Sequence, residues 1–288
     1  MNNRLIIVMG PTAVGKTSKA IEMAQQLDTH ILSFDSRQFY SELNIGVARP
    51  TDEELKAAPH HFIACRSVVQ PYNIFQYQDE AIRLLEQLFK EHQTVIAVGG
   101  SSLYAEALSH GVAVMPDPTP ELRAQLTYKL QTEGVEALQR QLQELDPVYY
   151  EKVDRQNGIR LQRAIEVCLT AGKPYSEMIQ NSKVERPFDI EYHIVETTPE
   201  NLRNRINLRV DMMMQQGLVE EVKSLTQYRQ LNTLNTVGYR EIFDYFDGKL
   251  SLEEAVVQIK NHTWQYARKQ LTWIKKLKKT LQNGNAIG

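Results

Sequence analysis

The chain has 288 residues, a formal net charge of −2 and two cysteines. Its length allows one large core and a smaller second unit, because single cores stop growing at about 250–300 residues. The near-neutral charge provides no overall field for a polyanion, so a nucleic-acid surface would need local basic clusters. Cys65 and Cys168 form no metal-ligand spacing, which argues against a zinc site, and two isolated thiols suit a cytoplasmic protein.

Apolar runs alternate with helical patterns in the first 115 residues. Residues 5–9, 30–34 and 94–98 are predicted to be buried strands, with residues 61–65 a weaker candidate. Residues 17–27 and 80–90 carry apolar side chains at helical spacing. The first run is too short for a signal sequence or a membrane span. The alternation predicts an α/β fold with a parallel sheet flanked by helices.

The pattern changes at Pro116, Pro118 and Pro120, where Thr119 is a good helix N-cap. Helices are predicted over residues 120–133, 135–145 and 157–171. A strand is predicted over residues 190–195. Further helices are predicted after Pro199 and over residues 252–277. We therefore expect a core of residues 1–117 and 190–288, interrupted by an all-helical domain over residues 118–189.

The run GPTAVGKT at 10–17 fits the P-loop pattern and lies between a predicted strand and a predicted helix. Glycines let backbone N–H groups turn toward phosphate oxygens, and the helix N-terminus adds unsatisfied donors. Lys16 would supply a point charge, and the Thr17 hydroxyl could ligate Mg²⁺. The residues predicted to bind a diphosphate or polyphosphate are Gly10, Pro11, Thr12, Ala13, Val14, Gly15, Lys16 and Thr17.

Asp35 directly follows a predicted strand, and the carboxyl ends of parallel strands line the ligand crevice of such folds. From the residues alone, three roles stay open: a Mg²⁺ ligand, a general base, or a cap of the following turn. A second glycine loop begins at Gly99 after another strand. It brings Ser101 to the same edge, where its hydroxyl could share a hydrogen bond with the group on which Asp35 acts.

Seven segments, taken in order, resemble the bacterial tRNA dimethylallyltransferases over nearly the whole chain. They are GPTAVGKT at 10–17, DSRQFY at 35–40, IGVARPT at 45–51, GGSSLY at 99–104, RLQRAIEV at 160–167, VGYR at 237–240 and RKQLTW at 268–273. The resemblance implies a P-loop NTPase-like core with an inserted helical tRNA-binding domain. It implies a monomeric, cytoplasmic enzyme that uses Mg²⁺, binds the anticodon stem-loop of tRNA and has no membrane partner.

The implied reaction moves a dimethylallyl group from dimethylallyl diphosphate to the exocyclic amine of an adenine. That adenine is 3′-adjacent to the anticodon of tRNAs reading codons that start with U, and the products are isopentenyladenosine and diphosphate. By the same resemblance, Asp35 is the general base, Ser101 replaces the family's threonine and keeps its hydroxyl, and Arg209 contacts the diphosphate. The residues implied to contact tRNA are Asp35, Ser36, Arg37, Gln38, Ser101, Arg123, Ile159, Arg160, Leu161, Gln162, Arg163, Val237, Gly238, Tyr239 and Arg240.

Two departures from the family pattern are visible. Val47 and Arg49 stand in a segment that usually reads GTAKP, so a polar side-chain role at 47 is lost while the charge at 49 is kept. Ser102 replaces a glycine and has less backbone freedom.

Basic residues cluster in two places. Arg160 and Arg163 share a helix face; helix physics alone favours surface ion pairs with Asp154 or Glu166, and the resemblance favours tRNA instead. The chain from Lys260 onwards carries seven basic residues and no acid, so the net charge of the remaining residues is −9. This asymmetry predicts a basic strip that faces phosphates. Both tryptophans of this segment are expected to pack into the core.

Other functions share the same cradle. A small-molecule P-loop kinase could use Arg160 and Arg163 as lid arginines, and a regulatory or RNA-binding NTPase is a third hypothesis. A prenyl transferase of free adenine nucleotides is close in chemistry, but the helical insertion and the basic tail argue against it. No NKxD-type guanine signature is present, which disfavours a GTPase.

Overall fold

The computed structural model describes residues 2–180 and 184–282. The chain forms two compact units: a core unit of Met1–Ser109 with Arg186–Gly288, and a helical unit of His110–Glu185. These boundaries precede the expected ones at 117/118 and 189/190. Arg186 already belongs to the core, because its guanidinium donates to the carbonyls of Ala107 and Leu108 at 2.5 and 3.0 Å.

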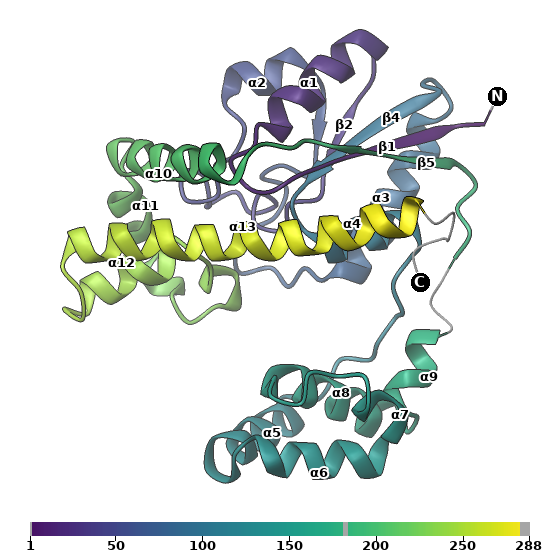
Figure 1. The fold of residues 1–288 in the computed structure, drawn as a ribbon, viewed down its shortest axis with the longest axis vertical. Coiled ribbons are helices and arrows are strands. Elements are labelled where there is room, and N and C mark those ends of the chain that lie inside the picture. Colours follow the sequence, from purple (N-terminus) through teal and green to yellow (C-terminus); the bar gives the residue numbers. More distant parts are fainter. Residues whose placement is uncertain (1, 181–183, 283–288) are drawn as a thin grey trace. The chain divides into compact units, whose positions relative to one another are not determined.

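A five-stranded parallel sheet forms the centre of the core unit, in the order β3-β2-β4-β1-β5 (Figure 1). Its strands are β1 (Arg4–Met9), β2 (Ile31–Ser33), β3 (His60–His61), β4 (Thr94–Gly99) and β5 (Asp189–Ile194). The predicted α/β class is confirmed, and four strands lie close to their expected ranges. The candidate strand at 61–65 is wrong: the chain turns at Phe62 and Ala64, which both have positive φ, and only β3 pairs.

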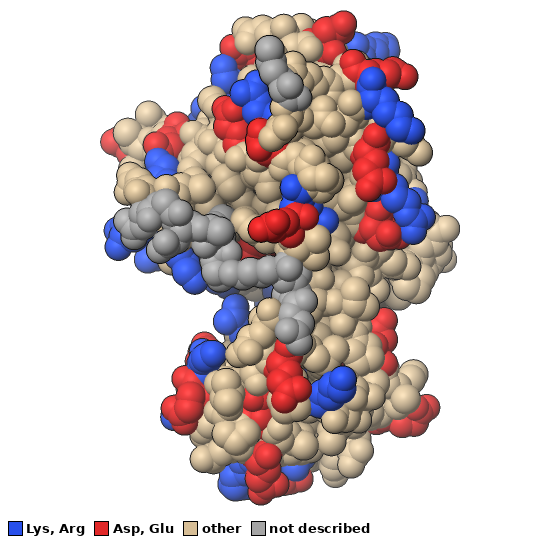
Figure 2. Space-filling model, turned by 90° about the vertical axis from the view of Figure 1, so that its right-hand side faces the viewer, with Lys and Arg blue, Asp and Glu red and all other residues tan. Residues whose placement is uncertain are grey.

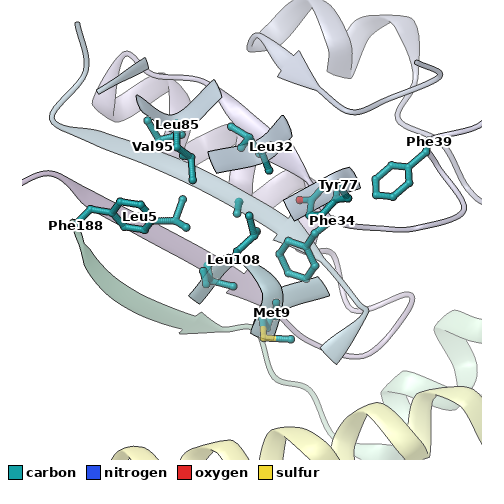
Figure 3. Close-up of a cluster of buried hydrophobic side chains, with 14 of the residues drawn as sticks. Leu5, Met9, Leu32, Phe34, Phe39, Tyr77, Leu85, Val95, Leu108 and Phe188 are labelled. Carbon is teal, nitrogen blue, oxygen red and sulfur yellow. The ribbon is translucent and has the colours of Figure 1, made fainter. Parts of the chain in front are cut away.

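Helices cover both faces of the sheet because alternate residues of each strand point to opposite sides. On one face, β1 contributes Leu5 and Met9 to a cluster with Leu85 of α3 (Ile74–Leu88) and Leu108 of α4 (Ser102–Ser109), part of which is drawn in Figure 3. On the other face, Ile6 and Val8 pack with α1 (Lys16–Leu27), and α2 (Asp52–Ala57) lies beside α1.

α3 begins well before the predicted helix at 80–90. Asn73 caps it, since its side chain accepts from the N–H groups of Phe75 and Gln76 while Gln76 bonds back to the N-cap backbone. This reciprocal capping box satisfies donors that would otherwise be unpaired.

The rest of the core unit is helical. It contains α10 (Pro199–Gln215), α11 (Leu218–Ser224), η1 (Thr226–Tyr228), η2 (Asn232–Leu234), α12 (Tyr239–Phe246) and α13 (Leu252–Gln282). α13 extends beyond the predicted end at 277 and runs beside α10 (Figure 1). Trp264 and Trp273 are half-buried against apolar clusters, as expected. In the part of the chain that the structure describes, no helix is long and apolar enough to cross a membrane.

The helical unit contains α5 (Pro120–Glu133), α6 (Val135–Leu145), α7 (Pro147–Tyr150), α8 (Gly158–Ala171) and α9 (Tyr175–Gln180). Its three long helices confirm the predictions, and Thr119 caps α5 by accepting from the N–H of Leu122. Leu138, Leu142 and Leu161 are fully buried between α6 and α8. The short helices α7 and α9 were not predicted. Asp146 joins them, accepting from Tyr149 and Ser176.

Candidate active site

The loop between β1 and α1 presents the N-terminus of a helix to a large cavity. Gly15 caps α1 with a φ of +98°, a conformation that L side chains rarely adopt. Lys16 follows as the first helical residue, and its ammonium group donates to the carbonyl of Pro11 at 2.8 Å. The loop therefore has the strand–turn–helix context that a phosphate cradle requires.

The cavity has a volume of about 1190 Å³ and lies entirely within the core unit. Its lining comes from seven segments of the chain: the P-loop, the turn after β2, residues 44–55, residues 60–64, the end of β4, α10 and α13. The predicted residues that line it are Thr12, Ala13, Gly15, Lys16, Thr17, Asp35, Gln38 and Arg209.

Positive charge is concentrated on the cradle wall. Burial lowers the pKa of Lys16 to about 8; the charge of Asp35 raises it in part, and that of Arg209 lowers it further. Arg209 donates to the hydroxyl of Thr12 at 3.3 Å, and burial followed by Arg205 lowers its pKa. The guanidinium of Arg205 lies 3.2 Å from where a Cβ of Gly15 would be. Sequence reasoning missed Arg205, although its i, i+4 spacing from Arg209 places both on one helix face.

Asp35 lines the cavity and also caps a turn. Its Oδ1 accepts from the N–H of Arg37 at 3.1 Å, and its carbonyl accepts from the N–H of Gln38 at 3.0 Å. The carboxylate acts electrostatically on both Lys16 and Arg209. Asp35 thus caps the turn, which is one of the three roles that the sequence allowed. The capping contact does not decide between the other two roles, Mg²⁺ ligand and general base.

Ser101 lies in a smaller cavity of about 180 Å³ beside the large one. The two cavities share Gly100, Tyr266 and Gln270 as lining residues. Tyr266 is 46% exposed, and desolvation by the surrounding protein, followed by the charge of Asp35, raises the pKa of its hydroxyl to about 12. Ser102 opens α4 with a helical backbone, so its replacement of glycine needs no unusual conformation.

Gln270 of α13 joins the two glycine loops. Its side-chain oxygen accepts from the N–H of Thr12 at 2.8 Å, and its amide nitrogen donates to the carbonyl of Gly100 at 2.8 Å. The residue is only 8% exposed, so these two bonds take the place of the hydrogen bonds that water makes to the same groups in the unfolded chain. Gln270 belongs to the RKQLTW segment, yet the sequence indicated no role for it because its partners are backbone atoms far away in the chain.

The loop of residues 44–51 forms another wall of the large cavity. Its carbonyls at Val47 and Ala48 accept from the side-chain amide of Gln38 at 3.3 and 3.0 Å. The contact at position 47 is made by the backbone, so valine provides it as well as threonine would. Arg49 donates to the carbonyl of Ser41 at 3.1 Å and also lines the cavity.

The residues predicted to contact tRNA fall into separate groups. In the helical unit, Arg123, Gln162 and Arg163 converge on the buried carboxylate of Glu166, so the expected ion pair is present for Arg163 at 3.6 Å. Ile159 is 78% exposed, Arg160 is exposed, and Leu161 is fully buried. Leu161 therefore presents no exposed atom to RNA in this structure.

The other groups belong to the core unit. Ser36, like Asp35, lies in the turn after β2, and Arg37 donates to the carbonyls of Asn232 and Thr233 at 3.3 and 3.0 Å. Val237 is half-buried, Gly238 is buried, and Arg240 is exposed and lies 3.5 Å from the carboxylate of Glu241. Tyr239 is fully buried, which leaves its side chain unavailable to RNA in this structure.

Acidic and basic side chains are interspersed on the face shown in Figure 2, in keeping with the small net charge. In the basic C-terminal segment, Lys260 pairs with Asp211 and Lys278 with Glu196, each at 2.6 Å. Arg268, Lys269, Lys275, Lys276 and Lys279 are exposed along α13.

Within residues 2–180 and 184–282, no group of three or more His, Cys, Asp or Glu side chains could hold a metal ion. Mg²⁺ often binds through one or two protein oxygens and completes its shell with water and substrate phosphates. The Thr17 hydroxyl lines the cavity next to Lys16, and one protein oxygen at this place fits a metal that is held together with a phosphate ligand.

The pKa of Lys16 leads to a test of the cradle. Its charge is present below about pH 8 and is lost as the pH rises through that value. A bound anion would raise this pKa again, so binding at higher pH takes up a proton. We expect the Kd of inorganic pyrophosphate, measured by calorimetry, to increase above that pH by up to about tenfold per unit. Lys16→Met should lose this component and keep only the titration of pyrophosphate itself; identical slopes would contradict the assignment.

Gln270→Glu tests the link between the two loops. The variant keeps the acceptor for Thr12 but places an oxygen against the carbonyl of Gly100. We expect the free energy of unfolding, measured in urea, to fall by about 1–3 kcal/mol. Pyrophosphate binding should also become weaker. Gln265→Glu, on an exposed position of the same helix, makes the same charge change. Equal behaviour of the two variants would show that the bridge has no such role.

A family model described as IPP transferase matches residues 38–277. The tRNA dimethylallyltransferase of Christiangramia forsetii is 44% identical over 276 residues, which cover 96% of this chain and 91% of that protein. The tRNA dimethylallyltransferase 1 of Bacteroides fragilis is 44% identical over 272 residues, 94% of this chain and 90% of its own.

Solved structures agree. The crystal structure of the tRNA isopentenylpyrophosphate transferase from Bacillus halodurans has 31% identity and a TM-score of 0.67, covering 95% of this chain and 87% of that one. A eukaryotic dimethylallyltransferase acting on tRNA, at 24% identity, shares the fold with a TM-score of 0.77 over 94% of this chain and 70% of its own. The chain belongs to the IPP transferase family of prenyl-transferring enzymes, as do the tRNA dimethylallyltransferases it resembles.

Proposed function

We propose that this chain is a Mg²⁺-dependent enzyme that transfers the dimethylallyl group of dimethylallyl diphosphate to tRNA. The acceptor is the exocyclic amine of the adenine 3′-adjacent to the anticodon, in tRNAs that read codons starting with U. The supporting observation is that the cationic cradle and the carboxylate of Asp35 line one cavity. The names of the relatives and the ordered sequence segments support the same substrates. We further propose that the enzyme acts in the cytoplasm as a monomer.

The first substrate uses the cradle. Lys16, Arg205 and Arg209 would take up the charge that develops on the diphosphate as its bond to carbon breaks, which is electrostatic stabilisation of a leaving group. Lys16 would exchange its bond to the carbonyl of Pro11 for one to a phosphate oxygen. Mg²⁺ would be held by the Thr17 hydroxyl and phosphate oxygens, and when bound it supplies further charge neutralisation.

The second substrate needs a base, because the lone pair of an adenine amine is delocalised into the ring. The amine nitrogen forms a bond to the first carbon of the dimethylallyl group, and the electrons of the broken carbon–oxygen bond leave on diphosphate. Asp35 accepts the proton that the amine loses. Ser101 would hydrogen-bond to the same amine and orient it. General-base assistance of this kind contributes about 10²–10⁴-fold to the rate.

The acceptor base must leave its stack to enter the cavity. Extrusion costs a few kcal/mol and is easiest in a single-stranded loop, as in an anticodon loop. At about 1190 Å³ the cavity exceeds ordinary small-molecule pockets of roughly 300–1,000 Å³. This size suits a site that receives a diphosphate and a nucleobase together.

One incubation tests the proposal. The protein is mixed with radiolabelled dimethylallyl diphosphate and either unmodified tRNA or AMP, with Mg²⁺ or with EDTA. We expect label in tRNA at the adenine beside the anticodon, dependence on Mg²⁺, and none in AMP. Label in AMP alone would indicate a nucleotide prenyl transferase, and ATP hydrolysis without transfer would indicate a kinase or NTPase.

Asp35→Asn separates chemistry from binding. The amide keeps an acceptor for the N–H of Arg37 but cannot take a proton at neutral pH. We expect kcat to fall by about 10²–10⁴-fold, while tRNA binding is retained. Pyrophosphate should bind at least as tightly as to the unmodified enzyme, because a negative charge that acts on Lys16 and Arg209 is removed. Near-normal turnover would rule out the assignment of Asp35 as the base.

A further inference from the structure

We propose that Glu221 of α11 is a positioning residue that holds the loop of residues 44–50 against the cavity and so places Gln38 and Asp35 for the tRNA substrate. This inference rests on the proposed function. Glu221 lies outside all seven segments that relate the chain to its family, and it does not line either cavity. Its effect on the reaction therefore passes through the loop.

The carboxylate of Glu221 binds three consecutive backbone N–H groups. Oε2 accepts from Asn44 at 3.2 Å and Ile45 at 2.7 Å, and Oε1 accepts from Gly46 at 3.0 Å. Successive N–H groups that point to one centre form an anion-binding nest. Here the anion is a side chain of the same protein, and hydrogen bonds to a charged acceptor are roughly twice as strong as neutral ones.

Tyr239 completes the shell of the carboxylate. Its hydroxyl donates to Oε1 at 2.6 Å. Burial, followed by the charge of Glu221, holds the pKa of Tyr239 well above its ordinary value, so the hydroxyl remains a donor. A Cβ on Gly46 would lie 2.5 Å from the Tyr239 ring, so only glycine permits this approach. The segments at 45–51 and 237–240 thus meet at Glu221.

The position of the carboxylate is set by packing. Leu218 and Val222, which flank Glu221 on α11, are fully buried in an apolar cluster that also contains Tyr239. Close-packed side chains of this kind resist displacement. α11 therefore provides a fixed anchor for a loop that has no regular secondary structure of its own between residues 44 and 50.

The loop passes this position on to the reacting groups. Its carbonyls at Val47 and Ala48 hold the side-chain amide of Gln38, and the backbone N–H of Gln38 donates to the carbonyl of Asp35. The cradle is fixed by other contacts, through β1, α1 and Gln270. Loss of Glu221 should consequently impair use of tRNA and leave diphosphate binding intact.

The test uses Glu221→Gln, which keeps the size of the side chain but turns an NH₂ group toward N–H donors. Glu220→Gln is the matched control, since Glu220 is the exposed neighbour on the same helix. We expect kcat/KM for tRNA to fall by about 10²-fold in Glu221→Gln, with the Kd of pyrophosphate unchanged. Tyr239→Phe, which removes one of four bonds, should have a smaller effect. Hydrogen exchange of the amides at 44–46 should become faster in Glu221→Gln alone.

Two kinetic results would overturn the proposal: transfer to tRNA that matches the Glu220→Gln control, or a parallel loss of tRNA use and pyrophosphate binding, which indicates general destabilisation. Failure of the proposed function gives a different result, namely no transfer to tRNA by the unmodified protein. Hydrogen exchange then still decides whether Glu221 holds the loop, and unchanged exchange at 44–46 would overturn that part as well.

Discussion

The concentration of positive charge beside the P-loop is the constraint on which the site depends. Lys16, Arg205 and Arg209 meet at one wall, where burial lowers the pKa of Lys16 and Arg209. Removing like charges from water is unfavourable unless an anion compensates. Asp35 compensates in part, and a diphosphate would do so more fully. The same carboxylate thus acts on the cradle charges and is the proposed base, so the two halves of the proposed reaction would be coupled through it.

The sheet brings these groups together, and helices fix them in place. β2, β4 and β1 are neighbours in the sheet, so the loops that follow them open at one edge. Such loops carry many backbone polar groups and few apolar contacts, and each needs a partner. Gln270 from α13 joins the loops after β1 and β4, and Glu221 from α11 holds the loop at 44–46. Both act on backbone atoms, which supply polar partners whatever the local side chain.

The helical unit shows a comparable arrangement. Glu166 is almost fully buried and gathers Arg123, Gln162 and Arg163 on one surface. Two of these contacts are ion pairs between a partly exposed arginine and the buried carboxylate, and the third is a hydrogen bond from the Gln162 amide. A tRNA phosphate would compete with Glu166 for the same guanidinium groups. The two interpretations of these arginines, as partners of Glu166 and as RNA-binding residues, are therefore compatible. Glu166 orients the guanidinium groups, and their exposed parts stay accessible to a phosphate.

The sequence alone determined the α/β class, most strands and long helices, the strand–turn–helix geometry of the glycine-rich loop at 10–17 and the placement of Asp35 at a strand end. These features depend on local periodicity, capping and glycine spacing, which are properties of neighbouring residues. Only the tertiary structure decided that Tyr239 is buried, that Arg205 joins Arg209 at the cradle, and that Gln270 and Glu221 hold backbone groups far away in the chain. A side chain whose partner is a backbone amide leaves no pairing pattern in the sequence, because every residue except proline has that amide.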